Sequence, residues 1–303
     1  LINAENLLVP AIAQLINKNI YDHGISVVNV GSTAYNRYVN IFKRKDGKSF
    51  GVPVAIISDL DVRALEYYDD NSKDRKTPRY WLKATLQKEL EKISKEVNYD
   101  QMSPFWSSKS AFESEIRKYK TDSFRPVGKN LNNMVALLTE DNMTVLNEEI
   151  LEQLRKEKKI RLETNVNYDT IKIFLPNSWT LEYEIACSRI YRLLELAIRA
   201  AQKEYNEPSL TIDEGVLMSL WDEVIKDYPE GYVHTKEDAY KIFKPLNEGT
   251  ISKAITAQYL AGMLAGELPP ISNGIVSLDY IKDAFETDAN LMYLTEGIKH
   301  VIG

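Results

Sequence analysis

Two aspartates at the end of an apolar run are the residues whose spacing most directly suggests chemistry. Asp59 and Asp61 follow residues 52–57, which are apolar on both faces. If extended backbone continues through them, a period of two aims both carboxylates to the same side. Converging carboxylates repel unless a cation lies between them, and hard oxygen ligands suit Mg²⁺ or Mn²⁺ with a phosphate partner. The short D-x-D spacing equally fits a turn cap beside a solvated aspartate.

Three more charged residues are candidates because of the elements that carry them. Glu5 lies near the amino end of a predicted first helix, and Glu182, with Glu184 beside it, lies in the first turns of a predicted helix over 179–205. Lys253 begins a small, apolar helical segment over 252–261. Each of these residues also has an interpretation without catalysis, because a helix dipole favours carboxylates at its amino end and a lysine keeps a helix soluble.

The other potential metal ligands and catalytic motifs of the sequence exclude several kinds of site. The sequence contains one cysteine, Cys187, and three histidines, so a zinc cluster or an internal disulfide is excluded and a metal site must be built from oxygen. It contains neither a P-loop nor a Gly-x-Gly-x-x-Gly motif, and no Ser-His-Asp or Cys-His order stands out. Nucleotide hydrolysis by this chain alone is therefore not expected.

The elements that must position these residues alternate between helix and strand. Apolar spacing predicts a helix over 7–16, a buried strand over 25–30, a short helix over 35–42 and a strand over 52–57. Another strand is predicted over 170–175, before the helix over 179–205. Such alternation is typical of a doubly wound parallel α/β sheet, in which ligands bind beyond the carboxyl ends of the strands.

A charged, helix-compatible stretch interrupts this pattern. Residues 66–165 read as a helical insertion, so we expect an α/β core over 1–65 and 166–205 and a helical C-terminal part over 206–303. The chain has a net charge of −6, yet residues 73–129 carry fourteen Lys or Arg against eight Asp or Glu. This basic insertion could hold DNA phosphates, and it fits a solvated helical hairpin equally well. The candidate contacts begin with Lys73, Arg75, Lys76 and Arg79.

Length and composition place the chain among ordinary globular proteins. Its 303 residues, 44% of them apolar, suffice for about two domains without disulfide or metal staples. No apolar run is long enough to cross a membrane and no signal segment opens the chain, so the expected location is cytoplasmic and without a membrane partner. Because the chain starts at Leu1 and enters helix-like sequence at once, we expect it to be part of a longer protein.

Together these segments resemble the TOPRIM nuclease region of OLD-family (overcoming lysogenization defect) proteins, a group that includes the Gabija-type anti-phage nucleases. The segments that carry the resemblance are residues 5–13 (ENLLVPAIA), 27–35 (VVNVGSTAY), 56–62 (IISDLDV) and 179–184 (WTLEYE), with looser matches over 251–261 and 293–298. About half of the chain carries the likeness, and residues 66–165 carry none.

The resemblance implies a TOPRIM, Rossmann-like sheet and a DNA endonuclease with two divalent cations. Carried over by position, Glu5 and Asp59 serve one Mg²⁺ or Mn²⁺, Asp61 and Glu182 help to hold the other, and Lys253 neutralises phosphate charge. Two such cations can activate a water and stabilise a leaving oxygen. The resemblance also implies an ABC-type ATPase domain, absent from this chain, as the only site for ATP, together with a partner helicase and a homo-oligomeric full-length protein.

One departure from the family pattern affects activity. The family has a further glutamate, followed by glycine, four residues before the position of Glu5, where this chain has Leu1 and Ile2. Either the chain begins inside the motif or a metal ligand is lost, so we expect weak or absent nuclease activity from this chain alone. Two alternatives remain: another TOPRIM chemistry, such as primase or topoisomerase, and a catalytically degenerate module that binds DNA or serves assembly.

Overall fold

The computed structural model describes residues 4–31, 34–46, 48–67, 151–152, 155–156, 158–164, 166, 168 and 170–303. The chain divides into two units, residues 1–61 with 159–303, called the core unit here, and residues 62–158. All the elements described below lie in the core unit. Residues of the expected C-terminal part thus share a unit with those of the expected α/β core, and the finer division into three parts stays a prediction.

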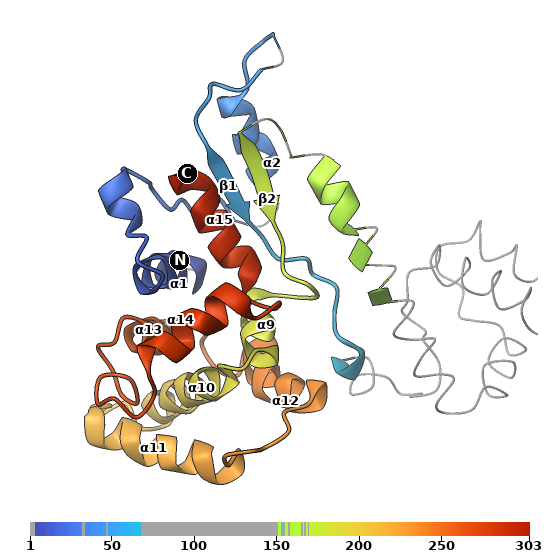
Figure 1. Cartoon of the computed structure of the whole chain (residues 1–303). Coiled ribbons are helices and arrows are strands. Elements are labelled where there is room, and N and C mark those ends of the chain that lie inside the picture. The colour runs from blue at the N-terminus through green and yellow to red at the C-terminus, as the bar shows by residue number, and fades with distance from the viewer. Residues whose placement is uncertain are drawn as a thin grey trace, which may run out of the picture. The chain divides into compact units, whose positions relative to one another are not determined.

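The core unit contains a parallel pair of strands, β1 (Val54–Ile57) and β2 (Ile171–Phe174) (Figure 1). Val54 lies opposite Ile171 and Ile57 opposite Phe174, so the two strands run in step and end together. The predicted strands over 52–57 and 170–175 are confirmed, as is the α/β class. Because the carboxyl ends of both strands lie at one edge, the loops that follow them can bring distant residues together.

The strand predicted over residues 25–30 is wrong. These residues adopt no regular structure, and the side chain of Val28 is 71% exposed. They follow a 3-10 turn, η1 (Ile20–His23), which ends at Gly24 with φ 67°. A strand needs a hydrogen-bonded neighbour, and within the described residues only β1 and β2 form a sheet. A β-branched sequence without such a partner remains irregular.

Helices form the rest of the core unit around this pair of strands. The first, α1 (Ala4–Leu15), packs against α13 (Lys253–Leu264) and α15 (Met292–Ile302), and α15 lies against both strands (Figure 1). At the centre of that contact a Cβ on Gly297 would lie 3.4 Å from both Ile57 and Phe174. The absence of a side chain at Gly297 thus lets α15 approach the sheet closely.

The helix predicted over 179–205 is two helices in the structure. α9 (Leu181–Cys187) ends at Ser188, and α10 (Tyr191–Asn206) starts three residues later. The backbone of Ser188 is extended, with ψ 169°, and its hydroxyl donates a hydrogen bond to the Ile185 carbonyl at 2.7 Å. The next amide, from Arg189, donates to the Asp288 carboxylate instead of continuing the helix. Side chains therefore satisfy the backbone groups at the break.

The C-terminal part is helical, as expected. After α10 follow α11 (Glu214–Asp227), α12 (Lys236–Asn247), α13, α14 (Leu278–Thr287) and α15. An aromatic contact joins α12 to the start of α9, where the Phe243 ring lies 4.9 Å from that of Trp179. None of the helices in the described part of the chain combines the length and the apolar character that crossing a membrane requires.

Candidate functional site

The position of Asp59 is fixed by the first turn of α9. Asp59 follows β1 by two residues, and its Oδ1 accepts a hydrogen bond from the Leu181 amide at 3.1 Å. The first amides of a helix lack intrahelical partners, so a carboxylate is a favourable acceptor there. This contact ties the loop after β1 to the element after β2, across 122 residues of sequence.

Three carboxylates from three elements crowd each other at this edge. Burial raises the pKa of Asp59, and the charges of Glu182 and Glu5 raise it further, to about 7. Burial also raises the pKa of Glu5, again with a contribution from Glu182. Glu5 lies in the first turn of α1 and Glu182 in the first turn of α9. We call Glu5, Asp59 and Glu182 the acid rim.

Asp61 lies near the acid rim, in a different geometry from the one its spacing suggested. The strand ends at Ile57, and Asp61 adopts a left-handed backbone with φ 52°. The period of two therefore does not reach it, and its side chain is exposed. Its amide donates a hydrogen bond to the Trp179 carbonyl at 2.9 Å, and its charge contributes to the raised pKa of Asp59 after burial and the two glutamates.

Lys253 supplies a positive charge to the acid rim. Its Nζ lies 3.3 Å from Oε2 of Glu182, a residue that is 8% exposed. Ser252 caps α13 by accepting a hydrogen bond from the Ile255 amide, which places Lys253 at the first helical position. A helix dipole disfavours a cation there, so Glu182 offsets that cost. The Lys253 side chain is 43% exposed and can reach a ligand from solvent.

Glu184, two residues from Glu182, has a structural role that the sequence did not separate from that of its neighbour. It is 1% exposed, and its Oε1 accepts hydrogen bonds from the amides of Ser178 and Trp179 and from the Ser178 hydroxyl. These contacts fix the loop between β2 and α9. Since the Trp179 carbonyl in turn accepts the Asp61 amide, Glu184 also holds Asp61 indirectly.

Tyr293 on α15 is a site residue that the sequence analysis did not single out. Burial raises its pKa well above the ordinary value, and Glu184, Asp59, Glu182 and Glu5 add to the rise through their charges. The phenol thus remains neutral among carboxylates and can donate a hydrogen bond. Its only signal in the sequence was the loose resemblance over residues 293–298.

The acid rim fits a divalent cation by the chemistry of its donors. All of them are carboxylate oxygens, and a cation would remove the repulsion that raises the pKa of Asp59. Across the described ranges, however, no group of three or more Asp, Glu, His or Cys side chains is arranged closely enough to enclose a metal ion. The described donors therefore do not form a complete ligand shell in this arrangement.

Some predicted site residues lie outside the described residues. These are the four proposed DNA contacts in the insertion, Lys73, Arg75, Lys76 and Arg79, and also Leu1. The structure brings together Glu5, Asp59, Glu182 and Lys253 from four separate elements, with Asp61 beside them. The roles assigned to these residues stay predictions.

Comparison with protein families identifies the segment that carries the first half of the site. Residues 3–61 match the family described as "Overcoming lysogenization defect protein-like, TOPRIM domain". Comparison with curated proteins and with solved structures gives no match. The chain therefore contains a TOPRIM region of the OLD-family type, and its fold is a TOPRIM, Rossmann-like α/β arrangement with a helical C-terminal part. Regions of this kind are nuclease-type or metal-binding modules, and TOPRIM domains generally bind divalent metal ions.

Proposed function

We propose that this chain, which carries a TOPRIM region of the OLD-family type, is the nuclease module of a divalent-metal-dependent DNA endonuclease. The observation that supports it best is the pKa of Asp59, which burial and the charges of Glu182 and Glu5 raise to about 7. A protein keeps buried like charges together at a cost to its stability, and a bound cation removes that cost. Phosphodiester hydrolysis is one of the reactions that a pair of divalent cations catalyses.

The residues divide into two candidate ligand pairs. Glu5 and Asp59 would hold one Mg²⁺ or Mn²⁺, and Asp61 and Glu182 would hold a second. Bound there, the two ions supply an activated water and charge stabilisation for the leaving oxygen. The Leu181 amide orients Asp59 through its hydrogen bond, and Glu184 orients Asp61 through the loop before α9.

Lys253 provides the positive charge that metal ligands cannot. It is paired with Glu182, and its side chain is 43% exposed, so its ammonium group is within reach of a phosphate at the acid rim. A fixed cation beside the reacting phosphate stabilises the negative charge that builds up in the transition state. We therefore assign Lys253 to the substrate, and Glu182 to the metal.

The wider setting is part of the same proposal. In a longer protein of this family, an ABC-type ATPase domain would bind ATP, and a partner helicase and homo-oligomerisation would direct the nuclease to its DNA, in the anti-phage manner of the Gabija group. The absence of a P-loop from this sequence agrees with ATP binding elsewhere.

A plasmid-nicking assay with the full chain in Mg²⁺ and in Mn²⁺ tests the proposal. We expect slow nicking that EDTA abolishes, because Leu1 stands where the family has a glutamate. Asp59→Ala should abolish the nicking. The matched control is Asp213→Asn, at the exposed N-cap of α11, where asparagine caps equally well. Metal-independent nicking, or nicking that survives Asp59→Ala, would contradict the proposal.

A catalytically degenerate module that binds DNA or serves assembly is the second candidate. Two observations favour it: no described group of acidic residues encloses a metal position, and Lys253 already partners Glu182. The two functions separate by direct binding, since a degenerate module binds DNA without binding Mn²⁺. Replacing Leu1 and Ile2 by glutamate and glycine should increase nicking if the module is catalytic, and should have no effect if it is degenerate.

A further inference from the structure

The segment between residues 35 and 50 has a charge opposite to that of the chain as a whole. It consists of α2 (Tyr35–Tyr38), the 3-10 turn η3 (Val39–Phe42) and a tight turn closed by the Lys43–Ser49 bridge. Against a single acidic residue, Asp46, it holds five basic ones, Arg37, Lys43, Arg44, Lys45 and Lys48, while the whole chain carries −6. We call residues 35–50 the basic hairpin.

Most of these cations have no counterion among the residues that the structure describes. Arg44 pairs with Asp46 at 2.9 Å, and Lys43 lies 5.1 Å from the centre of the Tyr168 ring. For Arg37, Lys45 and Lys48, which are exposed, no carboxylate of the described part of the chain lies within ion-pair distance. Unpaired cations on one small element create a local positive potential that attracts anions.

Apolar side chains are exposed among these cations. Tyr38 is 48% exposed, Ile41 65% and Phe50 61%. Exposed rings beside basic groups are typical of surfaces that bind nucleic acids, because the cations contact phosphates of single or double strands and ring faces can stack on unpaired bases. A surface that served only solubility would have no need of the rings.

The basic hairpin is attached next to the acid rim. Tyr35 and Val39 are its buried anchors, at 4% and 3% exposure. The Tyr35 hydroxyl lies close enough to Ser58 and Asp61 for both to influence its pKa, which burial raises. The other end of the hairpin leads into β1, four residues or about 13 Å long. The length of β1 thus separates the acid rim from the tip of the hairpin, the turn closed by the Lys43–Ser49 bridge. Duplex DNA spans the same distance with about four base pairs.

We propose that the basic hairpin holds the phosphate backbone of DNA, with its tip at the end of β1 opposite the acid rim. The inference rests on the proposed function for the identity of the ligand as DNA, and it goes further by naming a contact surface in the core unit. The insertion over 73–129 was the only DNA-contact region expected from the sequence. Arg37, Lys45 and Lys48 form the contact, with Tyr38 and Phe50 beside them.

Fluorescence anisotropy with a labelled 20-base-pair duplex in EDTA tests this contact without cleavage. The variant is Lys45→Glu with Lys48→Glu in the full chain. The matched control is Lys226→Glu with Lys236→Glu, the same charge change at exposed positions of α11 and α12. Circular dichroism and thermal unfolding verify that both variants fold.

We expect the hairpin variant to raise the Kd about tenfold or more, and the control less than about twofold. The slope of log K against log salt should fall by about two for the hairpin variant, since two phosphate contacts are lost. Equal losses in both variants, or wild-type binding by the hairpin variant, would overturn the inference. If the wild type binds DNA through the hairpin but cuts in neither Mg²⁺ nor Mn²⁺, the inference stands and the nuclease proposal fails.

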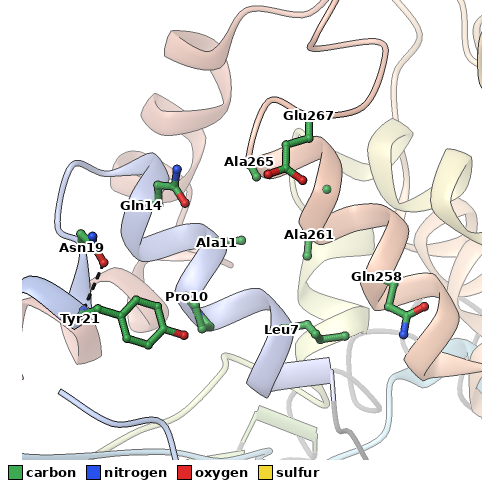
Figure 2. A pocket seen from close by; sticks show the side chains of 11 residues that line it. Leu7, Pro10, Ala11, Gln14, Asn19, Tyr21, Gln258, Ala261, Ala265 and Glu267 are labelled. Carbon is green, nitrogen blue, oxygen red and sulfur yellow. Dashed lines mark hydrogen bonds between the residues drawn. The ribbon is translucent and has the colours of Figure 1, made fainter. Parts of the chain in front are cut away.

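A groove lies between α1 and α13. Its cavity measures about 470 Å³, and Figure 2 shows Leu7 of α1 facing α13, which carries Gln258 and Ala261, with Pro10 beside Tyr21 and Glu267 at the upper end. The lining combines apolar side chains with amides, the Tyr21 phenol and one carboxylate, and none of these groups selects one occupant.

Discussion

The acid rim buries like charges together, whereas the basic hairpin leaves its charges in water. In the acid rim the pKa of Asp59 rises to about 7 because burial and two neighbouring carboxylates oppose its ionisation. In the basic hairpin Arg37, Lys45 and Lys48 are exposed and have no carboxylate of the described residues within ion-pair distance. Buried crowding lowers stability and is tolerated where a ligand relieves it, while exposed charge costs little and acts at a distance.

The largest predicted effect concerns Lys253, the only cation given a role at the acid rim. Lys253→Met should lower the nicking rate about 100-fold, because the phosphate loses its fixed positive charge. Mn²⁺ affinity should rise, since Glu182 loses its partner at 3.3 Å and the acid rim becomes more negative. Nicking kinetics and calorimetric Mn²⁺ titration measure the two effects.

Lys241→Met is the matched control, because Lys241 forms an ion pair with another partly buried carboxylate, that of Asp238, at 3.6 Å. Lys241→Met should change neither the nicking rate nor the Mn²⁺ affinity. If Lys253→Met lowered the rate and the Mn²⁺ affinity together, Lys253 would act through the structure of the metal site and not on the phosphate.

Glu184→Ala should be the most destabilising change near the acid rim. It leaves the amides of Ser178 and Trp179 and the Ser178 hydroxyl without their acceptor in a buried loop. The free energy of unfolding should fall by about 3 kcal/mol, measured by urea denaturation. Glu184→Gln keeps one oxygen and should lose less. Glu223→Ala, at a 59% exposed side chain, is the control, and an equal loss there would refute the role of Glu184.

The stability of the metal-free protein should depend on pH through Asp59. The pKa of Asp59 is about 7 in the folded state and 3.8 ordinarily. Between pH 3.8 and pH 7 the folded state therefore keeps a proton on Asp59 that the unfolded state has released. Stability therefore falls as pH rises through that window, by about 4 kcal/mol in all. The stability of Asp59→Asn relative to wild type should therefore be higher at pH 8.5 than at pH 5, by about 2 to 3 kcal/mol. A constant difference at both values would show that crowding is not the cause.

Neutralising the basic hairpin should scarcely change stability. Lys45→Gln with Lys48→Gln removes two exposed charges without partners in the described residues, so the free energy of unfolding should change by less than about 0.5 kcal/mol. Thermal unfolding at low and high salt measures this. A loss of 1 kcal/mol or more would mean that the hairpin cations serve the fold, and the contrast with the acid rim would disappear.

The sequence predicted those parts of the molecule that depend on local patterns. Both strands of the sheet, the short helix over 35–42 and the helical C-terminal part follow from apolar spacing. Asp59 and Glu182 could be assigned to one edge because parallel strands end together. The pairing of Lys253 with Glu182, across 71 residues, depends on how α13 packs, and no local pattern contains it.

The remaining differences come from interactions that the sequence does not display. Residues 25–30 have strand-like side chains but no neighbouring strand among the described residues. Ser188 breaks a helix because its own hydroxyl and the Asp288 carboxylate satisfy the freed backbone groups. Asp61 leaves the extended conformation, with φ 52°, and its amide is held by the loop that Glu184 fixes. In each case tertiary partners decided the local conformation.

The proposed function requires that carboxylates distant in sequence share a cation at the acid rim. Calorimetric titration of the full chain with Mn²⁺ at pH 8, comparing wild type with Asp59→Asn and Asp213→Asn, tests it directly. We predict saturable binding by the wild type and by Asp213→Asn, and an affinity at least about tenfold lower for Asp59→Asn. Equal Mn²⁺ binding by Asp59→Asn and the wild type, or none by the wild type, would contradict the account.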